Sequence, residues 1–245
     1  MLIAETNNKE MVLELQNNLD SIREKIRAAL VSCPDPEREV TIVAASKKQP
    51  WERIQALAQL GHIHFGENYV QEGLEKIRAL GDKNLKWHFI GGLQSNKAKY
   101  IPEAFHLVHS LDSYKTAQAL SKRAQKLGLI QEVLIQVNLG RERQKAGIWK
   151  QDLHEFASYI YQLESLRLSG LMLMPPLSRD PEESRPYFAE LRTLKDNLEQ
   201  DLNVKLPHLS MGMSQDYVQA VQEGATLIRL GSVLLGSRPE CGVSG

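Results

Sequence analysis

The sequence predicts an α/β protein, a (β/α)8 TIM barrel with an extra N-terminal helix. Short apolar runs rich in β-branched residues alternate with amphipathic helical stretches eight times in about 200 residues. Strict alternation of strand and helix implies right-handed crossovers and therefore a parallel sheet. No GxGxxG follows the first apolar run, which argues against an open, doubly wound dinucleotide-binding sheet.

The N-terminal stretch from about residue 10 to residue 30 repeats its apolar residues on a helical period. The Cys33-Pro-Asp-Pro36 segment then ends the helix. We expect this helix to cover the side of the barrel that the short last unit leaves bare. Its predicted buried face consists of Leu13, Leu19, Ile22, Ile26 and Leu30.

The first strand is predicted at Val40–Ala45 (VTIVAA), an apolar run bounded by charged residues. Pro50 stands where a helix can begin, and that helix ends at Gly61. The same pattern continues to the end of the chain. Further strands are predicted at 62–65, 86–90 (KWHFI), 105–109, 132–138 (EVLIQVN), 166–174, 206–210 and 226–230 (TLIRL). The helices between them are predicted at about 67–80, 95–101, 113–127, 150–164, 183–201 and 214–223, with a short turn near 232–235.

No linker, charge block or low-complexity segment interrupts this pattern. We therefore predict a single domain over residues 1–245, with the barrel at about 40–239. The hydrophobic fraction of 42% is enough to bury a core, which excludes disorder as the dominant state.

The net charge is zero, because 30 basic residues balance 30 acidic ones. A neutral total gives no support for non-specific nucleic-acid binding or for capture on an anionic membrane. Any anion that the protein binds must therefore be held by a local arrangement of groups.

We expect a cytoplasmic protein. No stretch approaches the roughly 18 apolar residues of a membrane span, and the acidic segment Met1–Glu10 is unlike a secretory signal. The two cysteines, Cys33 and Cys241, do not form a CxxC, which excludes a disulfide framework and argues against a thiolate zinc site.

Lys47 follows the first predicted strand directly, where a barrel of this kind places its active site. Against an apolar barrel mouth the amine is partly desolvated, which lowers its pKa and lets it form a Schiff base with a carbonyl. The alternative is an ordinary solvated loop lysine. Lys48 is expected to be the solvated neighbour, because adjacent strand residues point to opposite faces.

Two Gly- and Ser-containing turns follow the last two strands, at Ser210-Met-Gly-Met-Ser214 and at Gly231-Ser232. Backbone N–H groups and helix starts at these loops frequently hold a phosphate in this fold. Ordinary capping of the helices by serine is the alternative.

Arg229 interrupts the apolar strand Leu227-Ile-Arg-Leu230. It lies either on the outer surface in an ion pair or inside the barrel toward a ligand. Facing a pyridine nitrogen, an arginine that keeps its proton would hold that nitrogen unprotonated and weaken the ring as an electron sink.

None of the seven histidines belongs to an HExxH or another close metal-binding motif. His62 and His64 share a face of the predicted second strand and could chelate a metal, but packing in the core or barrel is favoured. No GxSxG or GxxxxGK[ST] motif is present, which leaves an α/β-hydrolase or a P-loop nucleotide site without support.

Several segments occur in the order found in a known family. They are Ala45-Ser-Lys47, Phe65-Gly-Glu-Asn-Tyr-Val-Gln-Glu72, Trp87-His-Phe-Ile-Gly-Gly-Leu-Gln-Ser-Asn-Lys97, Leu209-Ser-Met-Gly-Met-Ser214 with Asp216, and Ile228-Arg-Leu-Gly-Ser232 through Gly236-Ser-Arg238. Over residues 40–239 the chain closely resembles the pyridoxal phosphate homeostasis proteins. The resemblance implies a barrel of the alanine racemase N-terminal type, fold-type III, that binds pyridoxal 5′-phosphate (PLP).

The resemblance also implies roles for individual residues. Lys47 would form the Schiff base, Asn68 would lie near the ring and Arg229 would face the pyridine nitrogen. Lys145 becomes a family position of interest. The family often reads Ser-Lys-Thr-Lys-Pro after the first strand, and here Gln49 replaces the second lysine of that loop. The residues that would cradle the phosphate are Ser210, Met211, Gly212, Gly231 and Ser232.

Three functions remain open from the sequence. The first is a PLP-binding regulator or carrier that influences amino-acid and keto-acid balance without catalytic turnover, with PLP-dependent apoenzymes as its partners. The second is an amino-acid racemase, which needs a base on each face of the substrate and, in related enzymes, a second domain that 245 residues do not accommodate. The third is a phosphosugar enzyme. We expect a monomer, since no long apolar stripe marks a dimer surface.

Overall fold

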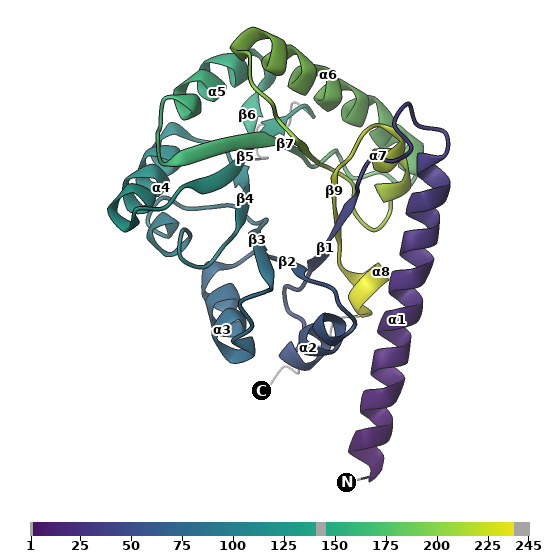
Figure 1. Ribbon diagram of the computed structural model, residues 1–245. Coiled ribbons are helices and arrows are strands. Elements are labelled where there is room, and N and C mark those ends of the chain that lie inside the picture. The colour runs from purple at the N-terminus through teal and green to yellow at the C-terminus, as the bar shows by residue number, and fades with distance from the viewer. Residues whose placement is uncertain (1, 141–145, 238–245) are drawn as a thin grey trace, which may run out of the picture.

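Eight parallel strands close into a barrel in the computed structural model, which describes residues 2–140 and 146–237 (Figure 1). Each strand pairs with its neighbours in chain order, and the last pairs with the first to complete the ring. The strands of the ring are β1 (Thr41–Ala45), β2 (His64–Glu67), β3 (Lys86–Phe89), β4 (Leu107–Leu111), β5 (Gln131–Asn138), β7 (Leu166–Leu173), β8 (His208–Ser210) and β9 (Leu227–Leu230). The two-residue strand β6 (Ile148–Trp149) also pairs with β5 and was not predicted from the sequence.

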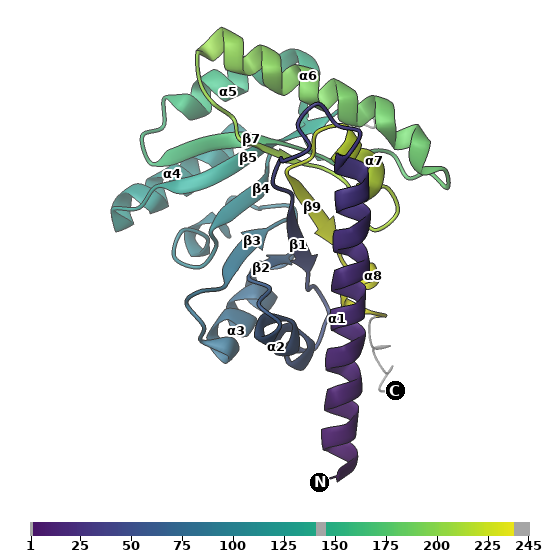
Figure 2. The ribbon, with the colours of Figure 1, turned by 45° about the vertical axis from the view of Figure 1, so that its right-hand side comes forward.

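Helices surround this ring, as Figures 1 and 2 show. The α-helices are α1 (Leu2–Leu30), α2 (Trp51–Gln59), α3 (Val70–Leu80), α4 (Tyr114–Leu127), α5 (Leu153–Tyr161), α6 (Arg185–Leu202), α7 (Tyr217–Gln222) and α8 (Ser232–Leu235). Three 3-10 turns, η1 (Ala98–Tyr100), η2 (Lys150–Asp152) and η3 (Pro181–Ser184), complete the connections. Among the described residues no helix is long and apolar enough to cross a membrane.

The N-terminal helix α1 packs along α2, α7 and α8 and continues past the barrel at its own N-terminal end (Figures 1 and 2). This confirms that the helix covers the side next to the short last unit. It begins at Leu2, earlier than predicted. Leu15, Leu19, Ile22 and Ile26 are buried against the neighbouring helices, whereas Leu13 is 61% exposed, so its predicted burial was wrong.

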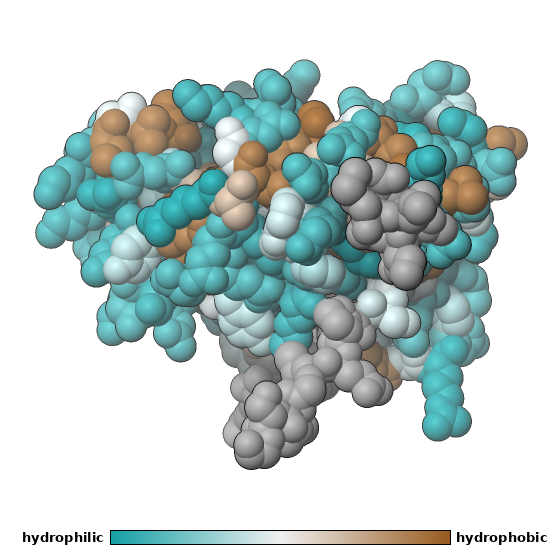
Figure 3. Space-filling view, turned by 90° about the horizontal axis from the view of Figure 1, so that it is seen from below, coloured by the Kyte–Doolittle hydropathy of each residue, from teal (hydrophilic) through white to brown (hydrophobic). Residues whose placement is uncertain are grey.

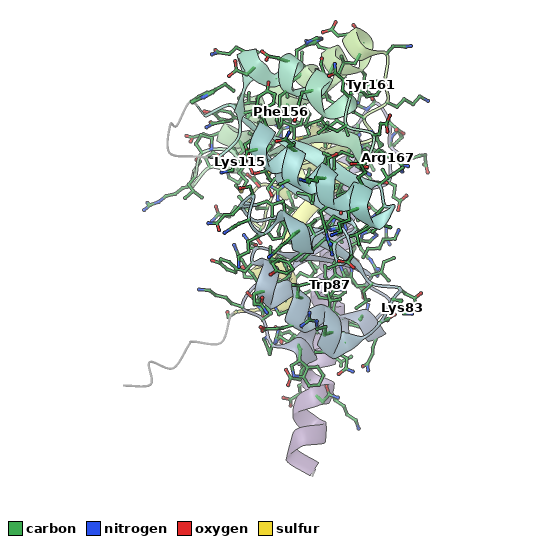
Figure 4. All side chains as sticks on the ribbon, turned by 90° about the vertical axis from the view of Figure 1, so that its left-hand side faces the viewer. Lys83, Trp87, Lys115, Phe156, Tyr161 and Arg167 are labelled. Carbon is green, nitrogen blue, oxygen red and sulfur yellow. The ribbon has the colours of Figure 1, made fainter. Side chains whose placement is uncertain are left out.

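Side chains alternate between two apolar layers along the strands. One layer lies between strands and helices, where Phe65 packs against Trp87 and where Phe156 of α5 is fully buried (Figure 4). A smaller cluster fills the inside of the barrel from β1, β4, β5, β7 and β9. It consists of Val43, Leu107, Leu134, Met172 and Leu227.

Two element boundaries differ from the sequence prediction in ways that affect the site. The second strand is His64–Glu67 and not 62–65, because its pairing with β3 starts at His64 opposite Lys86. The helix predicted from residue 214 begins only at Tyr217, because the Asp216 carboxylate accepts a hydrogen bond from the Met213 N–H and closes an extra turn before it.

The face seen from below in Figure 1 is mainly hydrophilic (Figure 3). Its hydrophobic residues form small groups and not one continuous area. Elsewhere along the chain the most exposed large hydrophobic residue of the described segments is Leu177, at 88%, in the loop between β7 and η3.

Candidate functional site

The predicted site residues gather at the carboxyl ends of four strands, β1, β2, β8 and β9. Ala45 pairs with Gly66 across β1 and β2, and Val43 pairs with Arg229 across β1 and β9. The turn with Lys47, the segment with Asn68 and the start of α8 at Gly231 therefore lie on one rim of the barrel. This agrees with the location that a TIM barrel uses for its chemistry.

Lys47 lies in a tight turn directly after β1, and its side chain is half-buried. Lys48 is exposed and has a left-handed backbone conformation, with φ of 57°. The prediction that Lys48 is the more solvated of the two is confirmed. The reason given for it was wrong, because both residues belong to a turn and not to alternating strand positions.

A buried ion pair holds this turn from the outside of the barrel. The three N–H bonds of the Lys76 ammonium on α3 have three acceptors: the Ser46 carbonyl oxygen at 2.6 Å, Glu67 Oε1 at 2.7 Å and Glu72 Oε1 at 2.7 Å. The Ser46 hydroxyl donates to the same Glu67 oxygen at 2.7 Å, and the Lys48 N–H donates to Glu72 at 2.6 Å. The residues on both sides of Lys47 are therefore fixed by α3 and β2.

The Glu67 side chain is fully buried, and burial raises its pKa, opposed by the Lys76 ammonium and by the Ser46 hydroxyl. Its second oxygen, Oε2, has no hydrogen-bond partner among the described residues. The pairing of Glu67 with Lys76 was not predicted from the sequence. The signal available was the spacing of Glu72 and Lys76, four residues apart on one helix face.

Gln49 takes the place of the second lysine that the family often carries in this loop. It is 5% exposed, and its amide nitrogen donates to the Gly236 carbonyl at 3.1 Å. Here this position ties the loop after β1 to the end of α8, so it joins the first and last units of the barrel.

Asn68 lies beside the turn, and its backbone is held by close packing against Gly91. A Cβ atom added at Gly91 would lie 2.1 Å from the Asn68 carbonyl oxygen. Asn68 Oδ1 is buried without a hydrogen-bond partner among the described residues. Asn68 and Gly91 also line a cavity of about 470 Å³ that reaches to Lys97. At this point of the rim the amide oxygen therefore receives no hydrogen bond from the described residues.

Arg229 points into the barrel, so the alternative of an outward-facing ion pair is wrong. Its guanidinium donates to Ser210 Oγ at 2.6 Å and to the Leu173 carbonyl at 3.0 Å. The side chain is 5% exposed, and burial lowers its pKa to about 10, an effect that the Asp216 carboxylate opposes. Alternation along β9 decides this orientation, since Ile228 and Leu230 fill the outer layer.

The three residues at the end of β8 face in different directions. The Ser210 hydroxyl points into the barrel toward Arg229 and His109, which lies 2.7 Å away through its Nδ1. The Met211 side chain belongs to the outer core, so only its backbone faces the rim. Gly212 has φ of +90°, and a Cβ atom there would lie 2.6 Å from Ala220 Cβ, so this position requires glycine.

The second turn begins the last helix. Gly231 precedes α8, and the nearest atom to a Cβ placed on it would be the Ala45 carbonyl oxygen, at 3.8 Å. Ser232 is exposed. This turn therefore faces the end of β1, on the same side as Lys47. Lys145, the other lysine singled out from the sequence, lies outside the described residues.

His62 and His64 do not point toward a shared metal position. His62 Nε2 donates to the His64 carbonyl at 2.8 Å, while the His64 ring turns into the barrel toward His88. Within the described part of the chain no group of three His, Cys, Asp or Glu residues could hold a metal ion. Packing inside the barrel, the favoured interpretation, is confirmed for His64.

Fold and sequence together define a barrel of the alanine racemase N-terminal domain family, whose match extends over residues 17–239. The structure is also similar to an alanine racemase of Clostridium difficile, with a TM-score of 0.71 over 93% of this chain and 58% of that one, at 17% identity. At that identity the likeness concerns the fold alone.

Relatives with higher sequence identity show to which family within this fold the chain belongs. The pyridoxal phosphate homeostasis protein of Aquifex aeolicus is 44% identical over 220 residues, which is 90% of this chain and 96% of that protein. That of Escherichia coli K12 is 38% identical over 232 residues, 92% and 97% of the two chains. The solved PipY protein of Synechococcus elongatus with PLP bound gives a TM-score of 0.80 at 37% identity, covering 91% and 100%. The chain belongs to the pyridoxal phosphate homeostasis family.

Proposed function

We propose that this protein binds PLP and acts in PLP homeostasis, holding the cofactor as a Schiff base on Lys47. The observation that carries the proposal is that PipY, similar over 91% of this chain, was solved with PLP bound, and that Lys47 stands here at the rim of the same fold. We place the protein in the cytoplasm as a monomer that supplies PLP to PLP-dependent apoenzymes.

The residues at the rim fit the chemistry of PLP. The cofactor brings an aldehyde, a pyridine ring with a phenolic oxygen, and a phosphate. Lys47 supplies an amine for the aldehyde on a turn whose backbone is fixed at Ser46 and Lys48. Beside the Lys47 turn, Asn68 Oδ1 is buried and has no hydrogen-bond partner among the described residues, so it can still accept a hydrogen bond.

The phosphate would be held at the neighbouring ends of β8 and β9. We propose that the backbone of Met211 and Gly212, together with Gly231 and the exposed Ser232, forms this cradle. The Ser210 hydroxyl already bonds Arg229 and contacts His109, so in this proposal Ser210 contributes through its backbone and through its hold on Arg229. This refines the sequence-based grouping of Ser210 with the other phosphate residues.

Arg229 would face the pyridine nitrogen. Its guanidinium keeps its proton and can only donate, so it requires the ring nitrogen to accept. A nitrogen held unprotonated makes the ring a weaker electron sink, which suits holding the cofactor better than catalytic turnover. Racemisation has no comparable support, because the likeness to alanine racemase concerns the fold alone.

Borohydride reduction after incubation with PLP, followed by peptide mass spectrometry, tests the proposal. The expected result is a yellow protein with one PLP fixed on Lys47, and a colourless Lys47→Ala variant. Lys48→Ala is the matched control, since that lysine is exposed in the same turn, and it should still be labelled at Lys47. A colourless wild-type protein, or label on another lysine, would overturn the assignment.

The absence of turnover needs a separate measurement. Prolonged incubation of single enantiomers of amino acids with the PLP-loaded protein should leave their optical purity unchanged. Loss of optical purity that disappears in Lys47→Ala would instead establish a racemase. Transfer to an apoenzyme faster than free dissociation of PLP is the result expected for a carrier.

A further inference from the structure

A continuous line of side chains crosses the inside of the barrel and ends at Arg229. It begins at His64, the first residue of β2, and passes through His88 of β3, His109 of β4 and Ser210 of β8. His64 Nδ1 lies 2.9 Å from His88 Nε2, and His88 Nδ1 lies 2.9 Å from His109 Nε2. His109 Nδ1 lies 2.7 Å from Ser210 Oγ, which accepts from Arg229. We name these residues the histidine line.

The hydrogen bonds of the histidine line must all be donated in the same direction, from Arg229 toward His64. Arg229 can only donate, so one lone pair of Ser210 Oγ is taken. Within the described residues the hydroxyl hydrogen has no acceptor other than His109 Nδ1, so His109 Nδ1 accepts it. His109 then carries its hydrogen on Nε2 and donates to His88 Nδ1. By the same step His88 donates from Nε2 to His64 Nδ1.

Burial keeps the three rings of the histidine line neutral. His88 and His109 are almost fully buried, and burial lowers both pKa values well below the usual range, with the Arg229 cation lowering that of His109 further. Burial also lowers the pKa of His64 to about 4. A charged histidine ring carries a hydrogen on both nitrogens. In a charged ring of the line, the hydrogen on Nδ1 would point at a neighbouring group that already donates to that nitrogen. Neutral rings with the hydrogen on Nε2 satisfy every contact.

We propose that His109, with His88 and His64 behind it, is a positioning residue for the cofactor: it fixes the Ser210 hydroxyl so that its free lone pair holds Arg229 in line with the pyridine nitrogen. Arg229 is then oriented from two sides, by Ser210 and by the Leu173 carbonyl. The cofactor part of this inference rests on the proposed function. The hydrogen-bond direction does not, because it concerns the protein without PLP.

Imidazole nitrogen NMR on the full chain before PLP is added tests the direction. The nitrogen shifts of His64, His88 and His109 should all report a neutral ring with its hydrogen on Nε2 at pH 7. His154, exposed on α5, serves as the reference ring. A hydrogen on Nδ1 in any ring of the line, or a charged ring at pH 7, would overturn the proposal whether or not PLP binds.

Two variants at His109 separate its two contacts. In His109→Asn the amide oxygen occupies the place of Nδ1 and still accepts from Ser210, but it does not reach His88. In His109→Gln the amide nitrogen occupies the place of Nε2 and still donates to His88, but Ser210 loses its acceptor. Thermal unfolding of both variants shows whether each one folds.

The positioning role predicts opposite outcomes for the two variants. His109→Gln should keep the His88 and His64 signals, raise the Kd for PLP about tenfold and shift the absorption band of bound PLP. His109→Asn keeps the acceptor of Ser210, so it should disturb the His88 signal and raise the Kd clearly less than His109→Gln does. Equal losses of affinity in both variants would show that His109 only fills space. Failure of all proteins to bind PLP would refute the proposed function and leave the NMR result standing.

Discussion

The Nζ atom of Lys76 lies 2.6 Å from the carbonyl oxygen of Ser46, the residue directly before Lys47. The same ammonium bonds the fully buried Glu67 carboxylate. A helix on the outside of the barrel thus holds the backbone of the turn that carries the proposed cofactor lysine. The stability of this ion pair and the shape of the rim are therefore coupled.

Replacing Lys76 tests that coupling. Lys76→Met leaves the Glu67 carboxylate buried without its cation, so we expect the free energy of unfolding to fall by about 3 to 5 kcal/mol. The reaction of Lys47 with PLP should also slow, because Ser46 loses the donor that fixes it. Urea unfolding and the rise of PLP absorbance measure the two effects.

Two controls accompany this variant. Arg123→Met removes the more exposed pair with Glu103 and should change stability by less than about 1 kcal/mol. The double variant Glu67→Gln, Lys76→Met removes both charges and should recover part of the loss. A Lys76→Met protein as stable as Arg123→Met would contradict the importance of the buried pair.

Gly91 and its neighbour Gly92 offer a matched pair of substitutions. Gly91→Ala would place a Cβ atom 2.1 Å from the Asn68 carbonyl oxygen, so the Asn68 backbone must move. Gly92→Ala meets no atom within 4 Å. We expect Gly91→Ala to weaken PLP binding at least about tenfold, equivalent to about 1.4 kcal/mol, and Gly92→Ala to leave it nearly unchanged. PLP titration followed by absorbance compares them, and equal affinities would argue against Asn68 as a ligand.

The docking of α1 can be measured with two leucines on opposite sides of the helix. Leu15 is fully buried, and Leu15→Ala should lower the free energy of unfolding by about 2 to 5 kcal/mol. Leu13 is 61% exposed, and Leu13→Ala should stay within about 0.5 kcal/mol. Denaturant unfolding gives both values. Equal effects would mean that α1 does not pack on the barrel as described.

Stability should fall in mildly acidic solution. Burial lowers the pKa of His62 from 6.5 to about 4, so the folded protein keeps this ring neutral where the unfolded chain binds a proton. The contribution of the neutral His62 ring to the free energy of unfolding is complete above pH 6.5 and is lost as the pH falls from 6.5 toward 4. At about 1.4 kcal/mol per pKa unit, His62 alone accounts for about 3 kcal/mol. Urea unfolding at several pH values measures the slope.

Substitution identifies the group responsible for that slope. His62→Gln retains an N–H that can donate to the His64 carbonyl and should make the pH dependence of stability less steep. Some slope should remain, because burial also lowers the pKa values of His64, His88 and His109. His154→Gln, at an exposed position on α5, is the control for replacing a histidine by glutamine elsewhere in the chain. An equal slope in the His62→Gln protein would assign the effect to the other buried histidines.

The sequence predicts the barrel well because its strands are bounded apolar runs. β1, β5 and β9 lie within about one residue of the predicted ranges, since each is flanked by charge or by a turn residue. The second strand was misplaced because its inward residues, His64 and Gly66, are not apolar. Hydrophobic periodicity carries no signal for a strand whose inner face is polar.

The candidate site was predicted only in part. The position of Lys47 follows from the end of one strand, a local signal. The histidine line depends on which strands are neighbours and on their register, which no local pattern contains. The bond of Lys76 to Glu67 depends on how α3 packs against β2, and only its bond to Glu72 has a local signal. Arg229 is an example. Alternation along the strand puts Arg229 on the face opposite to Ile228 and Leu230, but it does not say which of the two faces is inside the barrel. The Ser210 hydroxyl was assigned to phosphate because the sequence also left open whether this side chain lies inside the barrel.

The candidate site lies where the ring of strands closes. Lys47 follows β1 and Arg229 lies on β9, and these two strands pair with each other. These residues are among the first and the last that the barrel acquires as the chain leaves the ribosome. A nascent chain thus carries Lys47 long before Arg229 has been made. In the proposed function, the cofactor site is therefore complete only after nearly the whole barrel has been synthesised.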